Sequence, residues 1–326
     1  MAKEFLHLIC CPFTGLGLQN GFRGNEWFSY RISIFKQYPL KSLLSQTEKD
    51  FVLWVCFREQ ERENPITKQF YEDLNKTGLK FIFTFGGIPM YDDKYKFDNL
   101  QERLQIILPQ LKDVYNGEKY IYETLQPSDD FYHPKEIEEI QAQTYKERRI
   151  LTHGRGYVFN TKTQRLGLWN PRTARHQTCN PPFYTIMYPA DVFFDPDKHI
   201  RYMRNSISHE DVVWIFDPVR LNNYRYCVLI HGNQISTSWY HPYREGQFPW
   251  EYGKDIMKEW GFDIEIGEPQ EIKYGLIEIK GVIKYWIYTF LIKGRLYRIL
   301  KTLKNKHIDG KQKKEKGILP AADRQN

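Results

Sequence analysis

The sequence KYIYETLQPSDDFYHP, residues 119–134, sets an apolar run directly before a polar turn that carries two adjacent carboxylates. Residues 119–125 have the length and apolar content of a buried strand. Asp129 and Asp130 follow in the turn, where carboxylate oxygens suit a hard divalent cation that can neutralise a departing diphosphate. An acidic turn before a helix has the same composition. The surrounding chain has to separate these two interpretations.

Apolar runs alternate with helical patterns through the first 150 residues. Strands are predicted at residues 5–12, 51–57, 79–85 and 119–125, and helices at residues 27–44, 66–76, 100–114 and 134–146. Such alternation indicates βαβ units and a mainly parallel sheet that is covered by helices. In open sheets of this kind ligands bind beyond the carboxyl ends of the strands. Asp129 and Asp130 fall at such an end, which favours a binding site.

After residue 146 the pattern changes to short strands and turns. Residues 155–159 and 165–169 predict a hairpin around a polar turn, and residues 181–189 and 226–230 predict further extended segments. We therefore expect a nucleotide-binding α/β half followed by a more irregular half on the acceptor side.

Length and composition predict a globular protein of a reducing compartment. The chain has 326 residues, of which 16% are aromatic, and its five cysteines show no C-x-x-C spacing. The first residues read as a strand and not as a secretory signal. No apolar segment of 18 residues is present, so we expect a cytoplasmic protein without a membrane span.

The net charge of +7 belongs to the end of the chain. Residues 271–326 carry 14 Lys and Arg against 5 Asp and Glu, whereas residues 1–270 carry 33 against 35. A slightly acidic body without a recognised nucleic-acid motif argues against nucleic-acid binding. Residues 282–306 mix aromatic and aliphatic side chains with seven basic residues and no acid. This composition suits peripheral binding to an anionic membrane surface, and a terminal helix packed on the domain is the alternative.

Five segments in order carry a resemblance to a known family. They are WFSYRISIFKQYPLKSLLSQTEKDFVLWV (27–55), ETLQPSDDFYHPKEIEEIQ (123–141), GYVFNTKTQRLGLWN (156–170), NPPFYTIMY (180–188) and CVLIHGNQISTSW (227–239). Together they resemble a rhamnosyltransferase-like family of glycosyltransferases of GT-A type, over about residues 5–240.

The resemblance implies a GT-A-like α/β domain at residues 1–245, with a mostly parallel sheet flanked by helices. Residues 246–326 are then a C-terminal helical extension with a lysine-rich tail. The implied function is metal-assisted transfer of a sugar from a nucleoside-diphosphate sugar to a glycan or lipid-linked acceptor, as in polysaccharide biosynthesis, with inversion expected from direct attack. The alternative is a catalytically degenerate protein that binds a sugar nucleotide or a glycan.

The resemblance also implies a metal site for Mn²⁺ or Mg²⁺. Asp129 is the expected main ligand, with Asp130 beside it and His231 completing the shell late in the chain. The motif of the family reads Asp-Ser-Asp-Asp, but Pro127 stands where its first Asp would be. That departure weakens donor or metal binding or shifts the role of the missing Asp to Gln126.

Further residues are expected to bind the donor. Ser128 supplies a hydroxyl within the acidic motif. Arg31 matches an arginine of the family pattern that can pair with the diphosphate, and a surface ion pair is its alternative. Glu59, after the second strand, is expected against the base or ribose, and a charged turn explains it equally well.

A catalytic base is expected in the second half of the chain. Glu210 and Asp211 resemble the acidic element that takes the acceptor's proton in many inverting GT-A enzymes. Asp191 is the second candidate, and the capped start of a surface helix at Ser208 is the structural alternative for the Glu210 pair.

Overall fold

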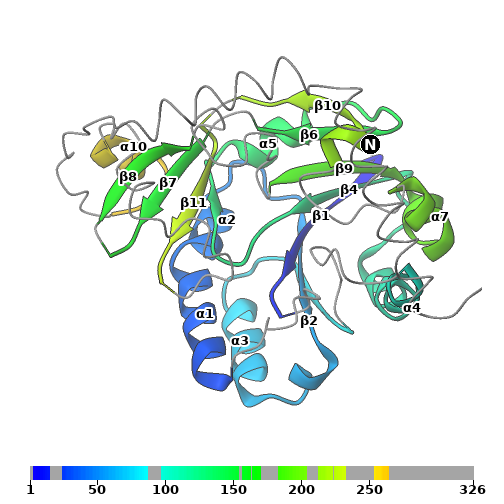
Figure 1. Ribbon diagram of the computed structural model, residues 1–326, viewed down its shortest axis with the longest axis horizontal. Coiled ribbons are helices and arrows are strands. Elements are labelled where there is room, and N and C mark those ends of the chain that lie inside the picture. The colour runs from blue at the N-terminus through cyan, green and yellow to red at the C-terminus, as the bar shows by residue number, and fades with distance from the viewer. Residues whose placement is uncertain are drawn as a thin grey trace, which may run out of the picture. The chain divides into compact units, whose positions relative to one another are not determined.

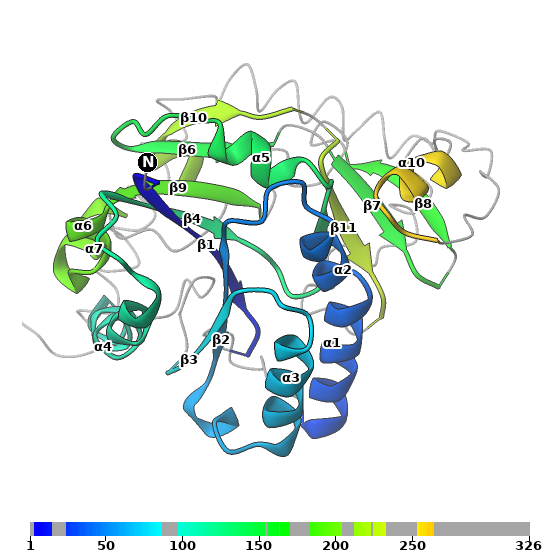
Figure 2. The same cartoon turned by 180° about the vertical axis from the view of Figure 1, so that it is seen from behind.

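The fold is seen in a computed structural model that describes residues 3–14, 24–86, 97–153, 156–162, 164–169, 183–203, 212–222, 224–232 and 253–263. All of these residues belong to one compact unit, and its largest sheet has seven strands (Figures 1 and 2). The expected basic segment 282–306 lies outside the described residues, as do Glu210 and Asp211. None of the helices that the structure describes is long and apolar enough to cross a bilayer.

The main sheet is mostly parallel, as the alternating sequence pattern predicts. Its order is β10-β6-β9-β4-β1-β2-β3, and β9 is antiparallel to both of its neighbours. The strands are β1 (Phe5–Pro12), β2 (Val52–Phe57), β3 (Phe81–Phe85), β4 (Tyr120–Leu125), β6 (Arg149–Thr152), β9 (Tyr184–Pro189) and β10 (Asp217–Arg220). Strand β2, VLWVCF, is buried along its whole length, which is typical of a parallel strand covered on both faces.

The order of the strands reverses at β1. Strands β2 and β3 lie on one side of β1, whereas β4 pairs in parallel with its other side. The chain segments that leave the carboxyl ends of β1 and β4 therefore diverge, and open α/β sheets bind ligands in the crevice at such a switch point. The Asp129 turn follows β4 directly.

Helices cover both faces of the sheet. Side chains of β1 alternate between the faces, so Ile9 and Cys11 belong to one hydrophobic core and Leu8 and Cys10 to the other. The first core includes α1 (Asn25–Gln37), α2 (Pro39–Leu44), α3 (Pro65–Asn75) and α5 (Glu136–Gln141). The second includes α4 (Phe97–Ile107), the 3₁₀ helix η2 (Leu108–Val114), α6 (Ala190–Phe193), α7 (Pro196–Tyr202) and α8 (Val212–Ile215).

Three predicted helices differ from the observed ones for local reasons. The helix predicted at 27–44 is two helices, because Pro39 has no N–H to continue α1 and begins α2 instead. The helix predicted at 100–114 becomes a 3₁₀ helix where Pro109 interrupts it. The helix predicted at 134–146 ends at Gln141, because the apolar spacing stops at Ile140 and Tyr145 stacks on Tyr120 of β4 instead.

A second, four-stranded sheet follows the order β5-β11-β7-β8. Its strands are β5 (Phe131–Tyr132), β11 (Tyr226–Ile230), β7 (Gly156–Asn160) and β8 (Arg165–Trp169). The predicted hairpin is confirmed, since β7 and β8 pair antiparallel. Gly156 lies so close to Tyr226 that a Cβ there would meet its ring at 2.6 Å and its carbonyl oxygen at 2.7 Å. The absent side chain thus permits β7 to approach β11.

Helix α10 (Gly253–Glu259) adds to the core under the small sheet. Met257 and Trp260 pack in one hydrophobic cluster with Tyr38 and Phe131, and the Trp260 ring meets that of Phe131 edge-on. The division of the chain at residue 245 stays a prediction.

Glu123 is a buried carboxyl group within the main sheet. Its neighbours across the strands are Leu8 of β1 and Ile186 of β9, and it is 6% exposed. Burial raises its pKa from 4.5 to about 7. A carboxyl whose pKa is higher in the folded state stabilises the protein fully below its unfolded-state pKa. That contribution is lost as pH rises through about 7.

We expect Glu123→Gln to remove this pH dependence, since the amide has nearly the same shape and no charge. The free energy of unfolding of the wild type should fall relative to the variant between pH 5 and pH 8, by on the order of 3 kcal/mol. Urea unfolding at both pH values measures it. Buried histidines such as His7 titrate equally in both proteins and cancel. If the wild type and the variant differ in unfolding free energy by the same amount at pH 5 and at pH 8, Glu123 is not forced to ionise in an apolar site.

Candidate functional site

Polar side chains gather where parallel strands of the main sheet end. Thr14 follows β1, Glu61 follows β2, and the turn Gln126–Asp130 follows β4. His153 follows β6, whose last residue and that of β4 both lie opposite Tyr184 of β9. These groups come from separate βα connections but share the carboxyl edge of the sheet.

Four side chains meet at this edge, and three of them surround the guanidinium group of the fourth, Arg31. Arg31 Nη1 donates to Asp129 Oδ2 at 2.6 Å and lies 3.0 Å from His231 Nε2. Arg31 Nη2 donates to Ser128 Oγ. The ring nitrogen of His231 is 3.1 Å from Asp129 Oδ2. The structure therefore brings together four of the residues expected from the sequence, across separations of up to 200 positions.

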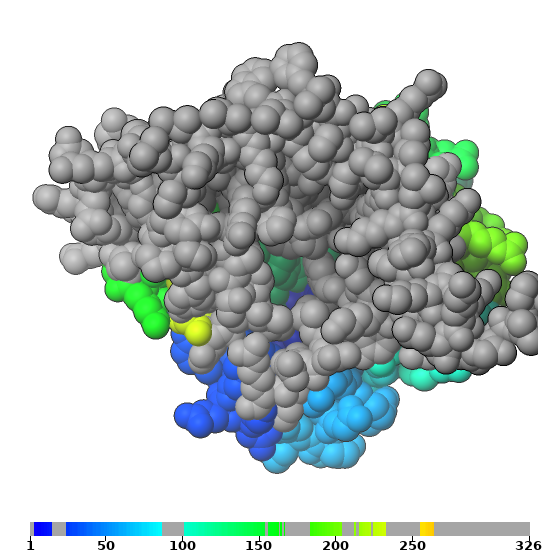
Figure 3. Space-filling view, viewed as in Figure 1, coloured from blue at the N-terminus to red at the C-terminus, as the bar shows by residue number. Residues whose placement is uncertain are grey.

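Three elements build this cluster. Arg31 lies on α1, Ser128 and Asp129 lie in the turn after β4, and His231 directly follows β11. Tyr30 of α1 also donates a hydrogen bond to the carbonyl oxygen of His231 at 3.0 Å. The end of β11 accordingly lies beside α1, as Figures 1 and 3 show. The cluster thus joins the small sheet to the main one.

The neighbours of Asp129 stabilise its ionised form. Burial alone would raise its pKa, but the positive charge of Arg31 and the hydrogen bond with His231 outweigh burial and hold the pKa well below the ordinary value. The Asp129 side chain keeps 13% of its surface exposed, whereas that of Arg31 keeps 3%. Asp129 is thus an ionised carboxylate at every physiological pH.

Asp130 has a different environment from its neighbour. Its Oδ1 accepts the backbone N–H of Leu229 at 2.8 Å, and the residue is 4% exposed. Burial, and then the adjacent charge of Asp129, raise the pKa of Asp130 well above its ordinary value. Asp130 therefore ties the turn after β4 to β11 through its hydrogen bond with Leu229.

Gln126 shapes the same turn from within. Its Nε2 donates to the carbonyl oxygens of Pro127, at 3.0 Å, and Asp130, and the residue is fully buried. Its expected contact with the donor stays a prediction.

The turn after β2 contains a buried group that the sequence analysis missed. Glu59 lies in an exposed ion pair with Arg62, at 2.9 Å from Nη2. Glu61 instead points inward: it is 1% exposed, accepts a hydrogen bond from Thr14 Oγ1 at 2.8 Å and pairs with Arg58. The 3₁₀ helix η1 (Glu59–Glu61) produces this difference, and only its short turn distinguishes the two glutamates.

A second buried pair of titratable side chains at this edge was also missed. His153 Nε2 lies 2.8 Å from Glu136 Oε1, and both side chains are almost fully buried. Burial opposes the charge of His153, but Glu136 outweighs burial and raises the pKa of the imidazole. The pair joins the end of β6 to α5, and no motif in the sequence predicts it.

Of the candidate bases, Asp191 belongs to the described residues, whereas Glu210 and Asp211 lie outside them. Asp191 lies in the first turn of α6, which follows β9 at the amino edge of β4, because Pro189 pairs with Tyr120. It is exposed and pairs with Lys198 at 2.9 Å. The structure therefore does not bring Asp191 to Asp129.

The side chains around Arg31 are of types that also bind a divalent cation. His231 Nε2 either accepts from Arg31 or donates to Asp129, according to its tautomer. A carboxylate, an imidazole and a hydroxyl, from Asp129, His231 and Ser128, converge on one cationic group, and the same types of ligand bind Mn²⁺ or Mg²⁺. The position between them is filled by the guanidinium. Within the described ranges no group of three or more His, Cys, Asp and Glu side chains stands ready to hold a metal ion.

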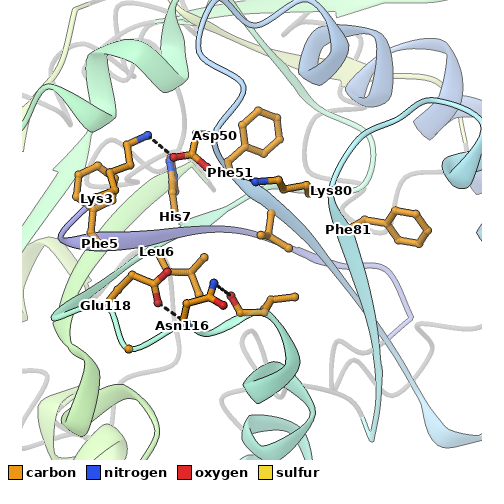
Figure 4. Close-up of a pocket in the computed structure, with 13 residues that line it drawn as sticks. Lys3, Phe5, Leu6, His7, Asp50, Phe51, Lys80, Phe81, Asn116 and Glu118 are labelled. Atoms are coloured by element: carbon orange, nitrogen blue, oxygen red, sulfur yellow. Dashed lines mark hydrogen bonds and ion pairs between the residues drawn. The ribbon is translucent and has the colours of Figure 1, made fainter. Parts of the chain in front are cut away.

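A cavity of about 670 Å³ lies at the opposite, amino edge of the sheet (Figure 4). It is lined by the residues that precede or begin β1, β2 and β3, including Lys3, His7, Asp50 and Lys80. Asp50 pairs with Lys3 at 3.0 Å and with Lys80 at 3.7 Å across its mouth. This cavity is separate from the Arg31 cluster.

Comparisons with known proteins return weak structural likenesses. No protein-family model matches the chain, and neither does any curated protein. The inositol-1-phosphate CTP transferase from T. maritima aligns with a TM-score of 0.40 at 10% identity, covering 81% of this chain and all of that one. Residues 1–349 of S. aureus TarS, in complex with UDP, align with a TM-score of 0.38 at 10% identity, covering 89% of this chain and 73% of that one.

We expect Asp130→Asn to be tolerated and Asp130→Ala to be destabilising. The Asn side-chain oxygen can still accept the Leu229 N–H, whereas Ala leaves that buried group without its acceptor, at a cost of about 2 kcal/mol. Chemical denaturation of both variants at pH 7 measures the difference. Equal losses for Asn and Ala would mean that the ionised carboxylate, and not the hydrogen bond, stabilises the turn.

Proposed function

We propose that the protein transfers a sugar from a nucleoside-diphosphate sugar to a glycan or lipid-linked acceptor, with metal assistance and with inversion. The observation that carries this proposal is the convergence of Arg31, Asp129 and His231 beside the carboxyl ends of β1 and β4. This is the switch point of the sheet, where a ligand is expected on topological grounds. The resemblance to rhamnosyltransferase-like GT-A enzymes motivates the donor class.

The nucleoside is expected at the ends of β1 and β2. Thr14 and Glu61 are buried there, hydrogen-bonded to each other, with Arg58 paired to the carboxylate. A hydroxyl, a carboxylate and a guanidinium are groups that recognise ribose hydroxyls and base edges in an otherwise apolar site. This trio is a stronger candidate for nucleoside contact than the exposed Glu59.

The diphosphate is expected at the cluster around Arg31. Arg31 is the cation suited to phosphate oxygens, and Ser128 and His231 can contribute hydrogen bonds. A divalent cation, when bound, supplies further neutralisation of the leaving diphosphate. Asp129 and His231, with Ser128, are the residues that would hold it.

The proton acceptor of an inverting transfer must reach the acceptor hydroxyl. Glu210 and Asp211 remain the proposed pair for this role and lie outside the described residues. Asp191 is dropped from the proposal, because it lies at the other edge of the sheet.

Binding without turnover is the second candidate function. Two observations favour it: Pro127 replaces the first carboxylate of the motif, and Arg31 already neutralises Asp129. Such a protein would bind a sugar nucleotide and release it unchanged.

Hydrolysis and binding of a panel of sugar nucleotides, with and without Mn²⁺, separate these functions. We expect the wild type to hydrolyse one donor slowly and Asp129→Asn to lower kcat/KM by about 100-fold, because a charge that organises the diphosphate site is lost. The matched control is Asp217→Asn, which removes an exposed carboxylate paired with Lys146. Donor binding without turnover would favour the second function, and no binding of any donor would contradict both.

A further inference from the structure

Asp129 has a resident cation. Arg31 Nη1 lies 2.6 Å from Asp129 Oδ2, and the same nitrogen lies 3.0 Å from His231 Nε2. Arg31 Nη2 is bonded to Ser128. One guanidinium therefore engages each of the three groups that a metal at Asp129 would use.

The arginine is held firmly in that place. It is 2% exposed and belongs to the middle of α1, and its guanidinium carbon lies 5.8 Å from the centre of the Trp27 ring. A buried carboxylate without a partner is costly, so Asp129 needs a cation whenever its side chain stays in this site. Arg31 meets that need without any added ion.

A divalent cation cannot simply join this arrangement. Mg²⁺ binds oxygen at about 2.1 Å, which is closer than the guanidinium nitrogen already stands to Asp129 Oδ2. Two cations that share one carboxylate oxygen would also repel each other strongly at low dielectric. Metal and Arg31 are thus alternatives for the same oxygen atom.

The other nearby carboxyl groups have partners of their own. Asp130 Oδ1 is used by the Leu229 N–H, at 2.8 Å, and Glu61 is paired with Arg58. Among the described residues of this edge, Asp129 is the carboxylate that lies against both Ser128 and His231.

We propose that Arg31 and the divalent cation compete for Asp129, so that the metal binds only when the guanidinium moves off the carboxylate. The proposal rests on the proposed function only in placing that metal at Asp129. It adds that this chain has weak intrinsic metal affinity, set by an arginine and not by a shortage of ligands.

Binding of Mn²⁺ alone to the full chain, followed by the electron paramagnetic resonance signal of free Mn²⁺, tests the competition. We expect Arg31→Gln to bind Mn²⁺ roughly 10- to 100-fold more tightly than the wild type, because the competing charge is gone. Arg31→Lys keeps the charge and should stay within about threefold of the wild type. Asp129→Asn should abolish binding.

The matched control is Lys36→Gln, which removes a positive charge from the same helix at an ion pair with Asp73. It should leave Mn²⁺ affinity unchanged. Equal or weaker Mn²⁺ binding by Arg31→Gln would overturn the competition and would mean that the arginine supports the metal site.

A second measurement needs no Arg31 variant. In the wild type with ¹⁵N-labelled arginine, saturating Mg²⁺ should shift one side-chain Nε–Hε resonance, and Asp129→Asn should shift the same resonance without Mg²⁺. Saturable Mg²⁺ binding that moves no arginine resonance would contradict the proposal. If Arg31→Gln binds Mn²⁺ no more tightly than the wild type while the wild type still hydrolyses a donor, the competition fails and the transferase proposal stands, so the two proposals are distinguishable.

Discussion

The ion pair between Arg31 and Asp129 is the interaction on which the candidate site depends. A carboxylate that is only 13% exposed is costly without a partner, and the pairing draws α1, the turn after β4 and the end of β11 to one point. The adjacent Asp130 reinforces the same junction through the Leu229 N–H. The two neighbouring carboxyl groups thus have different roles. Asp129 places a negative charge at the site, and Asp130 fixes the adjacent backbone.

The sequence predicted the sheet well because parallel strands are continuous apolar runs, and the Asp129 turn lies after β4 as the alternating pattern indicates. Arg31 and Ser128 were expected to bind the donor, and Asp129 and His231 were expected to bind the metal. Their mutual contacts were not foreseen, because they join positions as far as 200 residues apart. The helix breaks at Pro39 and Pro109 follow from the sequence alone, since proline has no N–H to continue a helix.

Other parts of the site could not be predicted from the sequence pattern. Glu59 and Glu61 differ only in the direction that one 3₁₀ turn gives them, and the inward one contacts Thr14. His153 and Glu136 form a buried pair with no motif. Asp191 looked suitable by residue type, but β9 runs antiparallel to β4 and delivers it to the amino edge. The edge of the sheet at which a side chain lies therefore decides whether it can take part in the site.

We infer that the carboxyl edge around Asp129, and not the cavity at the amino edge, receives the donor. A crystal structure of the full chain with Mn²⁺ and a nucleoside diphosphate tests it most directly. We expect an anomalous Mn²⁺ peak beside Asp129 and His231, the diphosphate next to it, and Arg31 moved off Asp129. A nucleotide bound in the cavity lined by Lys3, Asp50 and Lys80, with Arg31 still on Asp129, would contradict it.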